Sequence, residues 1–134
     1  MMPISKSRLS AASFVAWIAL VALCAAQPPT FKRTELQRGD LSAAGREVVQ
    51  AAVEFPSGAA SGKHTHPGEE VGYVLEGTIR FELDGQLPVM KKAGDVFLVP
   101  VGRIHNATNT GPGIAKVLAT YIVEKGKPLA TPVP

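Results

Sequence analysis

The feature that most limits the fold of this chain is a succession of short apolar segments separated by turn-forming residues. From Gln27 onward, runs rich in Val, Ile, Phe, Tyr and Thr alternate with Gly, Pro, Asn and Asp. β-branched and aromatic residues favour extended strands, whereas Gly, Pro, Asn and Asp favour the turns that join strands. The pattern predicts successive antiparallel strands, and therefore an all-β domain of the barrel or sandwich type.

Segment 46–55 shows the clearest strand pattern. Its apolar residues at positions 49, 51, 53 and 55 alternate with other side chains, as expected for a strand with one buried face. No helical periodicity and no solenoid repeat follow residue 26. Further strands are predicted, with hairpin turns at Glu76-Gly77 and Asp84-Gly85, over residues 71–75, 78–83, 96–99, 104–108 and 114–123.

The first 26 residues have a different pattern. Lys6 and Arg8 provide a short positive region, and an unbroken apolar run follows over residues 14–26. This order is typical of a secretory signal peptide, and the small side chains of Cys24 and Ala26 predict cleavage after Ala26. We therefore expect an exported protein, periplasmic or secreted, without stable membrane insertion after cleavage. Two alternatives stay open, namely retention of this segment as a membrane anchor and lipid modification of Cys24.

Cleavage after residue 26 would leave 108 of the 134 residues. The single tryptophan and single cysteine, Trp17 and Cys24, lie in the leader, so the mature domain has no disulfide. The 14 basic residues fall to 12 against 11 acidic residues, which leaves a formal charge of +1. Lys91 and Lys92 are adjacent but have no arginine or aromatic cluster beside them. We interpret this pair as a solvated turn and expect no nucleic-acid binding.

Residues 27–124 are predicted to form one domain, because a chain of this length supports a single hydrophobic core. Residues 125–134 are rich in proline and contain few large apolar side chains after Leu129. Proline cannot donate a backbone hydrogen bond to a sheet. We therefore expect this tail to add little to the core and to lie on the surface or stay loose.

The three histidines of the chain occupy positions that can point to one centre. His64 and His66 are two residues apart and share one face of an extended segment, and Glu70 follows a tight turn. His105 would join them from another strand. A single histidine in a strand is more often packed or exposed than a ligand. Three imidazoles and a carboxylate that converge, however, are ligands for a divalent transition metal.

The spacing of these residues resembles two motifs of the cupin superfamily. Residues 58–77 match the pattern G-x5-H-x-H-x3-E-x6-G at every defined position, and residues 94–109 match G-x5-P-x-G-x2-H-x3-N. The motifs occur in the expected order, with residues 78–93 between them. The chain is similar to the small single-domain cupins of type 2, which are quercetin-dioxygenase-like.

This resemblance implies a single β-barrel of the double-stranded β-helix, or jelly-roll, type with both motifs facing its interior. It assigns the metal-ligand role to His64, His66, Glu70 and His105, and it implies that Glu70 can double as a catalytic base. Such a ligand set leaves open coordination positions and suits Fe, Mn, Ni, Co or Zn. Cupins that resemble this chain commonly form homodimers, so a homodimer is expected.

Three functions fit such a site. The leading hypothesis is a metal-dependent dioxygenase-type oxidoreductase that acts on a small organic molecule. The second is a non-oxidative isomerase, decarboxylase or lyase, in which a Lewis acid stabilises an enolate. The third is a barrel that binds a small ligand without turnover. The complete ligand set favours catalysis, because simple binding does not need a metal with open positions.

Other residues near the motifs carry weaker predictions. Adjacent strand residues point in opposite directions, so only one of Glu69 and Glu70 can face the barrel interior. The resemblance to the cupin motif assigns the inward position to Glu70, and Glu69 is then predicted to be a solvated surface acid. Gly72 is predicted to face the interior and leave volume beside the metal. Asn109 is expected to support a turn rather than catalysis. The candidate residues for the pocket or its mouth are Tyr73, Phe81, Phe97 and Arg103. For each of them, packing in the core or exposure at the surface is an equally good explanation.

Overall fold

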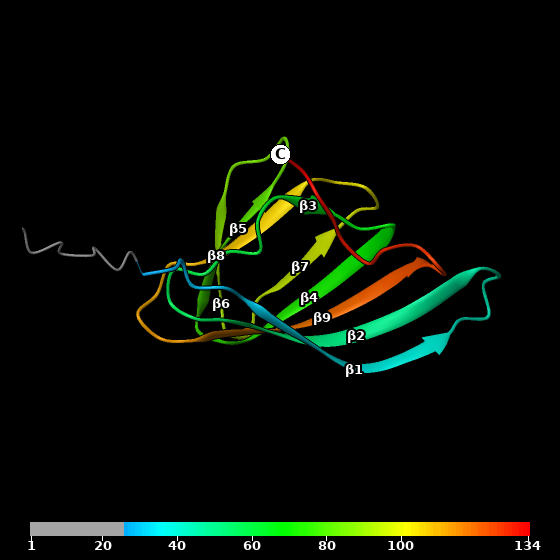
Figure 1. The fold of residues 1–134 in the computed structure, drawn as a ribbon, viewed down its shortest axis with the longest axis horizontal. Coiled ribbons are helices and arrows are strands. Elements are labelled where there is room, and N and C mark those ends of the chain that lie inside the picture. The colour runs from blue at the N-terminus through cyan, green and yellow to red at the C-terminus, as the bar shows by residue number, and fades with distance from the viewer. Residues whose placement is uncertain (1–25) are drawn as a thin grey trace, which may run out of the picture.

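The computed structural model describes residues 26–134, so the predicted signal peptide, except for Ala26, lies outside the described residues. Two five-stranded antiparallel sheets pack face to face (Figure 1). Between residues 26 and 134 there is no helix that could cross a membrane. The all-β prediction is confirmed for this part of the chain.

Each sheet takes strands from distant parts of the chain. The first sheet contains, in spatial order, β1 (Lys32–Asp40), β2 (Arg46–Phe55), β9 (Ala115–Glu124), β4 (Gly68–Glu76) and β7 (Val96–Val99). The second contains β10 (Thr131–Pro132), β3 (His64–Thr65), β8 (His105–Asn109), β5 (Thr78–Leu83) and β6 (Val89–Lys92). Most connections pass from one sheet to the other, which is the arrangement of the predicted double-stranded β-helix.

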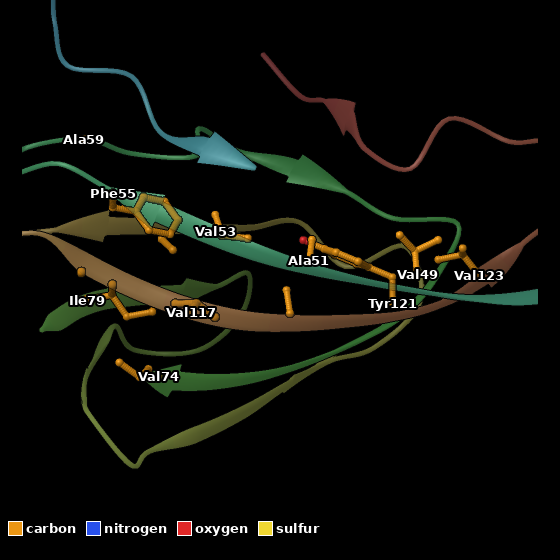
Figure 2. Packing of buried hydrophobic residues seen from close by; sticks show 13 residues of the cluster. Val49, Ala51, Val53, Phe55, Ala59, Val74, Ile79, Val117, Tyr121 and Val123 are labelled. Atoms are coloured by element: carbon orange, nitrogen blue, oxygen red, sulfur yellow. The ribbon is translucent and has the colours of Figure 1, made fainter. Parts of the chain in front are cut away.

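The core lies between the sheets because β2 and β9 bury alternate residues. Both strands show strict alternation between buried and half-buried positions along ten residues. They pair so that Val49 lies opposite Tyr121 and Val53 lies opposite Val117. Figure 2 shows this apolar cluster along the inner faces of the two strands, from Phe55 to Val49. Large-to-small changes here would leave cavities in the layer that separates the sheets.

The structure contains strands that the sequence pattern did not indicate. β1 and β6 lie at sheet edges and carry mostly exposed side chains, so they lack a buried apolar face. The prediction that Lys91 and Lys92 form a turn is wrong, because both lie in β6 and pair with Ile79 and Thr78 of β5. An edge strand with lysine side chains also resists unwanted pairing with other chains.

The C-terminal tail is attached to the barrel more closely than we expected. Thr131 and Pro132 form β10, which pairs with β3, and the Val133 amide donates to the Lys63 carbonyl. Leu129 packs against the main core cluster. The C-terminus lies beside β3 in Figure 1. Proline is tolerated here because β10 is an edge strand, where one side needs no hydrogen-bond donor.

Gly68 marks a close approach between β4 and β9. A Cβ atom at this position would lie 1.9 Å from the carbonyl oxygen of Ile122 and 2.7 Å from the Cα of Val123. Both contacts are with backbone, which cannot move without disturbing the β4–β9 pairing. The packing of the two strands therefore requires glycine at position 68.

We predict that Gly68→Ala destabilises the domain by about 1–3 kcal/mol, the usual cost of overpacking a tight site. Urea denaturation of the two proteins measures the difference. Gly39→Ala is the matched control, because Gly39 also lies in a strand and a Cβ there would meet nothing within 4 Å. Equal destabilisation by both substitutions would contradict the close-approach explanation.

Candidate metal centre

Two neighbouring strands and one strand of the facing sheet assemble the four predicted ligands. His64 of β3 lies directly opposite His105 of β8 in the second sheet. His66 follows β3, and Glu70 lies on β4 of the first sheet. Side chains that face inward from both sheets meet in the space between them, so residues far apart in the sequence become neighbours.

All four side chains are buried and close together. Relative exposure is 8% for His64, 3% for His66, 6% for Glu70 and 4% for His105. Each residue offers one potential ligand atom, and these four atoms all lie within 4.8 Å of one another. Uncompensated burial of a charged carboxylate among three imidazoles would be unfavourable, so this cluster requires cations or protons to balance it.

Backbone carbonyls fix the orientation of each imidazole. The Nδ1 atoms of His64, His66 and His105 lie 2.7, 2.6 and 3.0 Å from the carbonyl oxygens of Gly62, Leu129 and Arg103. A carbonyl only accepts, so each Nδ1 carries the donated proton and Nε2 keeps the lone pair in the neutral ring. Metal-binding histidines in proteins have this same arrangement.

The Nε2 atoms approach the carboxylate at a spacing that fits a shared ion. Glu70 Oε2 lies 3.0 Å from His66 Nε2 and 3.1 Å from His105 Nε2. Two ligand atoms bonded to one ion at about 2.1 Å and at right angles are about 3.0 Å apart. Two lone-pair atoms remain this close only with a proton or a metal ion between them. The donor set therefore fits a divalent transition metal.

The protonation states at neutral pH also suit metal binding. Burial lowers the pKa of His64 to about 4, although its hydrogen bond to the Gly62 carbonyl opposes this shift. Burial raises the pKa of Glu70, but its close contacts with the imidazoles of His105 and His66 outweigh that effect and bring it to about 2. His64 is thus neutral and Glu70 ionised near pH 7, which are the forms that bind a metal.

We predict that the chelator-treated protein loses stability as the pH falls. The ordinary pKa of histidine is 6.5 and that of folded His64 is about 4, so the unfolded chain binds more protons between these values. The unfolding free energy therefore decreases as the pH falls from 6.5 towards 4. Glu70, with an ordinary pKa of 4.5 and a folded pKa of about 2, extends the loss below pH 4.5.

Urea unfolding at a series of pH values from 7.5 to 4 measures this dependence. His64→Gln removes the titrating ring, so its stability should change less steeply between pH 6.5 and 4 than that of the wild type. An identical slope in the two proteins would show that His64 is not responsible.

A cavity of about 30 Å³ borders the cluster. This volume accommodates about two water molecules. His64, Glu70 and His105 contribute to its wall, together with the predicted pocket residues Phe81 and Phe97. Three further polar residues that no sequence motif indicated also line the cavity, namely Ser61, Arg33 and Tyr121.

Two predicted pocket residues do not line the cavity. Tyr73 faces outward from β4 and is 45% exposed, because it has the opposite strand parity to Glu70. The exposed Arg103 side chain donates to the Asp84 carbonyl instead. Strand alternation from Glu70 would have excluded Tyr73. No local pattern indicates the direction of Arg103, because it lies in a turn.

Gly72 faces the interior as predicted, but the expected free volume is absent. A Cβ atom at Gly72 would lie 2.0 Å from the ring of Phe97. This ring occupies the space beside Gly72 and stacks on Phe81, with ring centroids 4.5 Å apart. The role of the glycine is therefore to admit an aromatic ring into the cavity wall, and the cavity is correspondingly small.

The predicted orientation of Glu69 and the predicted structural role of Asn109 agree with the structure, although Glu69 is less solvated than expected. Glu69 is half-buried on the opposite face of β4 from Glu70. The amide of Asn109 donates to the carbonyls of Phe55 and Gly113, and its oxygen accepts from the Gly111 amide. Asn109 thus joins three backbone segments at one end of the barrel and has a structural role.

The fold and the cluster together define a class of small barrels in which two antiparallel sheets enclose a histidine and carboxylate site. Comparison with known proteins gives the family. The family model for the cupin domain matches residues 51–121, which is more than half of the chain. The chain belongs to the cupin superfamily.

The curated relatives share this domain but have different names. A germin-like protein 1-1 from Oryza sativa subsp. japonica is 33% identical over 82 residues, covering 55% of this chain and 37% of the relative. The HTH-type transcriptional regulator PuuR from Escherichia coli is 30% identical over 77 residues, covering 57% of this chain and 41% of the relative. The matched region thus spans about two fifths of each relative's length.

Solved structures show the same fold. An oxalate oxidase in complex with the substrate analogue glycolate has a TM-score of 0.63 and 22% identity, covering 81% of this chain and 63% of the other. A cupin superfamily protein from Desulfitobacterium hafniense has a TM-score of 0.60 and 21% identity, with 88% and 100% covered. DMSP lyase DddQ from Ruegeria pomeroyi has a TM-score of 0.63 and 25% identity, with 77% and 51% covered.

Proposed function

We propose that this chain is an exported, metal-dependent oxidoreductase of dioxygenase type that acts on a small organic molecule. The observation that carries the proposal is the set of three carbonyl-oriented imidazoles and one ionised carboxylate beside a cavity. His64, His66, Glu70 and His105 would hold a divalent ion of Fe, Mn, Ni, Co or Zn. Export follows from the predicted signal peptide over residues 1–26.

The cavity supports a small substrate. Its volume of about 30 Å³ favours a molecule of a few heavy atoms. One of the structurally similar proteins is an oxalate oxidase with glycolate bound, so the same fold accommodates a two-carbon acid.

Each part of the site has a definite task in this proposal. The bound ion would supply redox and Lewis-acid chemistry at its open positions. The three imidazoles keep their lone pairs towards the centre because their Nδ1 protons are engaged by carbonyls. Glu70 contributes a negative charge, and its pKa of about 2 makes it a poor general base near neutral pH. We therefore propose that Glu70 acts mainly as a ligand.

A non-oxidative lyase is the second candidate. The structural similarity to DMSP lyase DddQ supports it, because that protein places lyase chemistry on this fold. The two candidates differ in their need for dioxygen. Consumption of oxygen with small carboxylic acids, diketones or phenols supports the oxidoreductase. Metal-dependent turnover without oxygen uptake supports the lyase, and a ligand recovered unchanged indicates simple binding.

We predict that Glu70→Gln lowers metal affinity by more than about 100-fold and abolishes metal-dependent oxygen uptake, since it removes the anionic ligand. Metal content after purification is measured by inductively coupled plasma mass spectrometry. Glu69→Gln is the matched control, because it makes the same change on the neighbouring residue of the opposite face. Unaltered metal content in a double His64→Ala, His105→Ala variant would refute the site.

We also propose that the protein is a homodimer formed through the outer face of β4 and β7. Val71 pairs with Leu98 and Tyr73 pairs with Val96, so their outward side chains form one continuous apolar patch. Val96 and Leu98 are 59% and 58% exposed. Apolar patches of this kind commonly mark protein interfaces. We propose that a second copy of this chain covers the patch. The four side chains are uncharged, and two identical apolar faces are complementary to each other.

Leu98→Lys should weaken the dimer at least about tenfold, because it places a charge in the centre of the apolar patch. Sedimentation velocity over a range of protein concentrations measures the change. Leu87→Lys provides the control, since Leu87 is 87% exposed and lies outside both β4 and β7. A wild-type protein that is monomeric at all concentrations would contradict the dimer.

A further inference from the structure

Arg33 is a positively charged residue in the wall of the candidate site. β1 is mostly exposed, but Arg33 is half-buried and lines the same cavity as His64, Glu70 and His105. Arg33 lies opposite Val53 in the β1–β2 pair. An arginine at an inward position of an otherwise solvent-facing edge strand is unusual, because charged side chains are rarely buried without a partner.

Within the described residues, Arg33 has no carboxylate partner. Arg38 pairs with Glu35 and Glu47, and Arg80 pairs with Glu82. Arg33 forms no such salt bridge among residues 26–134, and its Nε atom is buried without a hydrogen-bond partner. A buried donor of this kind is unfavourable unless a ligand satisfies it.

Two aromatic rings hold the guanidinium in place. Its central carbon lies 5.6 Å from the ring centroid of Phe31 and 5.6 Å from that of Tyr121. The guanidinium also forms a side-chain hydrogen bond with Tyr121, whereas its Nε donor has no partner among the described residues. Arg33 is therefore oriented before any ligand arrives, which reduces the entropic cost of binding.

Glu70 does not serve as the counterion of Arg33. Its Oε2 atom contacts the Nε2 atoms of His66 and His105 instead. A metal ion in the cluster would engage the Glu70 charge further. The remaining wall of the cavity is largely apolar, with Phe55, Phe81 and Phe97 among its residues. Among residues 26–134 no carboxylate pairs with the guanidinium, so an acidic ligand would supply the missing anionic partner.

We propose that Arg33 binds the carboxylate group of a small organic acid and so determines the substrate class. A planar guanidinium matches a planar carboxylate through paired charge-assisted hydrogen bonds. The cavity volume of about 30 Å³ favours an acid of a few heavy atoms. The inference rests on the proposed function, because it takes the acid to be the substrate. With its carboxylate on Arg33, the rest of the acid would lie beside the four candidate metal ligands.

The experiment measures binding of oxalate to the chelator-treated full chain by isothermal titration calorimetry. It is repeated with acetate and the uncharged isostere acetamide, using both chelator-treated and Mn(II)-loaded protein. Arg33→Met removes the charge, and Arg33→Lys keeps it without the planar fork. Arg38→Met is the matched control on the same strand, because Arg38 lies outside the cavity. Metal content and thermal unfolding are measured for every variant.

We expect Arg38→Met to bind oxalate and acetate with the same affinity as the wild type does. Both proteins should bind acetamide at least about tenfold more weakly than acetate. Arg33→Met should weaken carboxylate binding by about ten- to a hundredfold, the usual effect of losing a hydrogen bond to a charged group. Arg33→Lys should show an intermediate loss. Its retained charge and similar length keep the proposal testable if Arg33→Met does not fold.

Two results would overturn the inference. One is unchanged carboxylate affinity in folded Arg33→Met or Arg33→Lys, and the other is failure of the wild type to bind oxalate or acetate in either metal state. Failure of the proposed function looks different. In that case the protein retains no metal or consumes no oxygen, while carboxylate binding to the chelator-treated chain still depends on Arg33, which supports the inference.

Discussion

The buried carboxylate of Glu70 is the constraint on which the rest of this structure depends. Removing such a charge from water costs several kcal/mol, and the site compensates by surrounding it with imidazoles. His66 and His105 lie 3.0 and 3.1 Å from the same carboxylate oxygen. This arrangement requires β4 of one sheet to face β3 and β8 of the other. The alternation of strands between the sheets is therefore what creates the site.

Orientation of the ligands extends the constraint to the backbone around the cluster. Each imidazole is held by a carbonyl, and one of these belongs to Leu129 in the C-terminal tail. The tail pairs with β3 through β10 and places Leu129 against the core. A segment with little apolar surface thus contributes to the chemistry through its backbone. Packing, strand pairing and ligand geometry depend on the same contacts at this point.

The cupin fold alone does not determine a reaction, as the different names of the relatives illustrate. Germin-like proteins and a transcriptional regulator share the domain, so function must be argued from the cavity. Here the cavity is small, since the ring of Phe97 occupies the space beside Gly72. It also contains an arginine without a carboxylate partner among the described residues. Both features favour a small anionic molecule.

The sequence by itself determined the all-β class, most of the central strands and the buried face of segment 46–55, because alternation and turn chemistry are local properties. Strand parity together with the spacing of the cupin motif also distinguished Glu70 from Glu69. Only the tertiary structure decided that Arg33 enters the cavity, that Phe97 fills the space at Gly72, and that the tail reaches His66. These outcomes depend on which strands become neighbours across the two sheets. Contacts between residues that are distant in sequence leave no periodic signal along the chain.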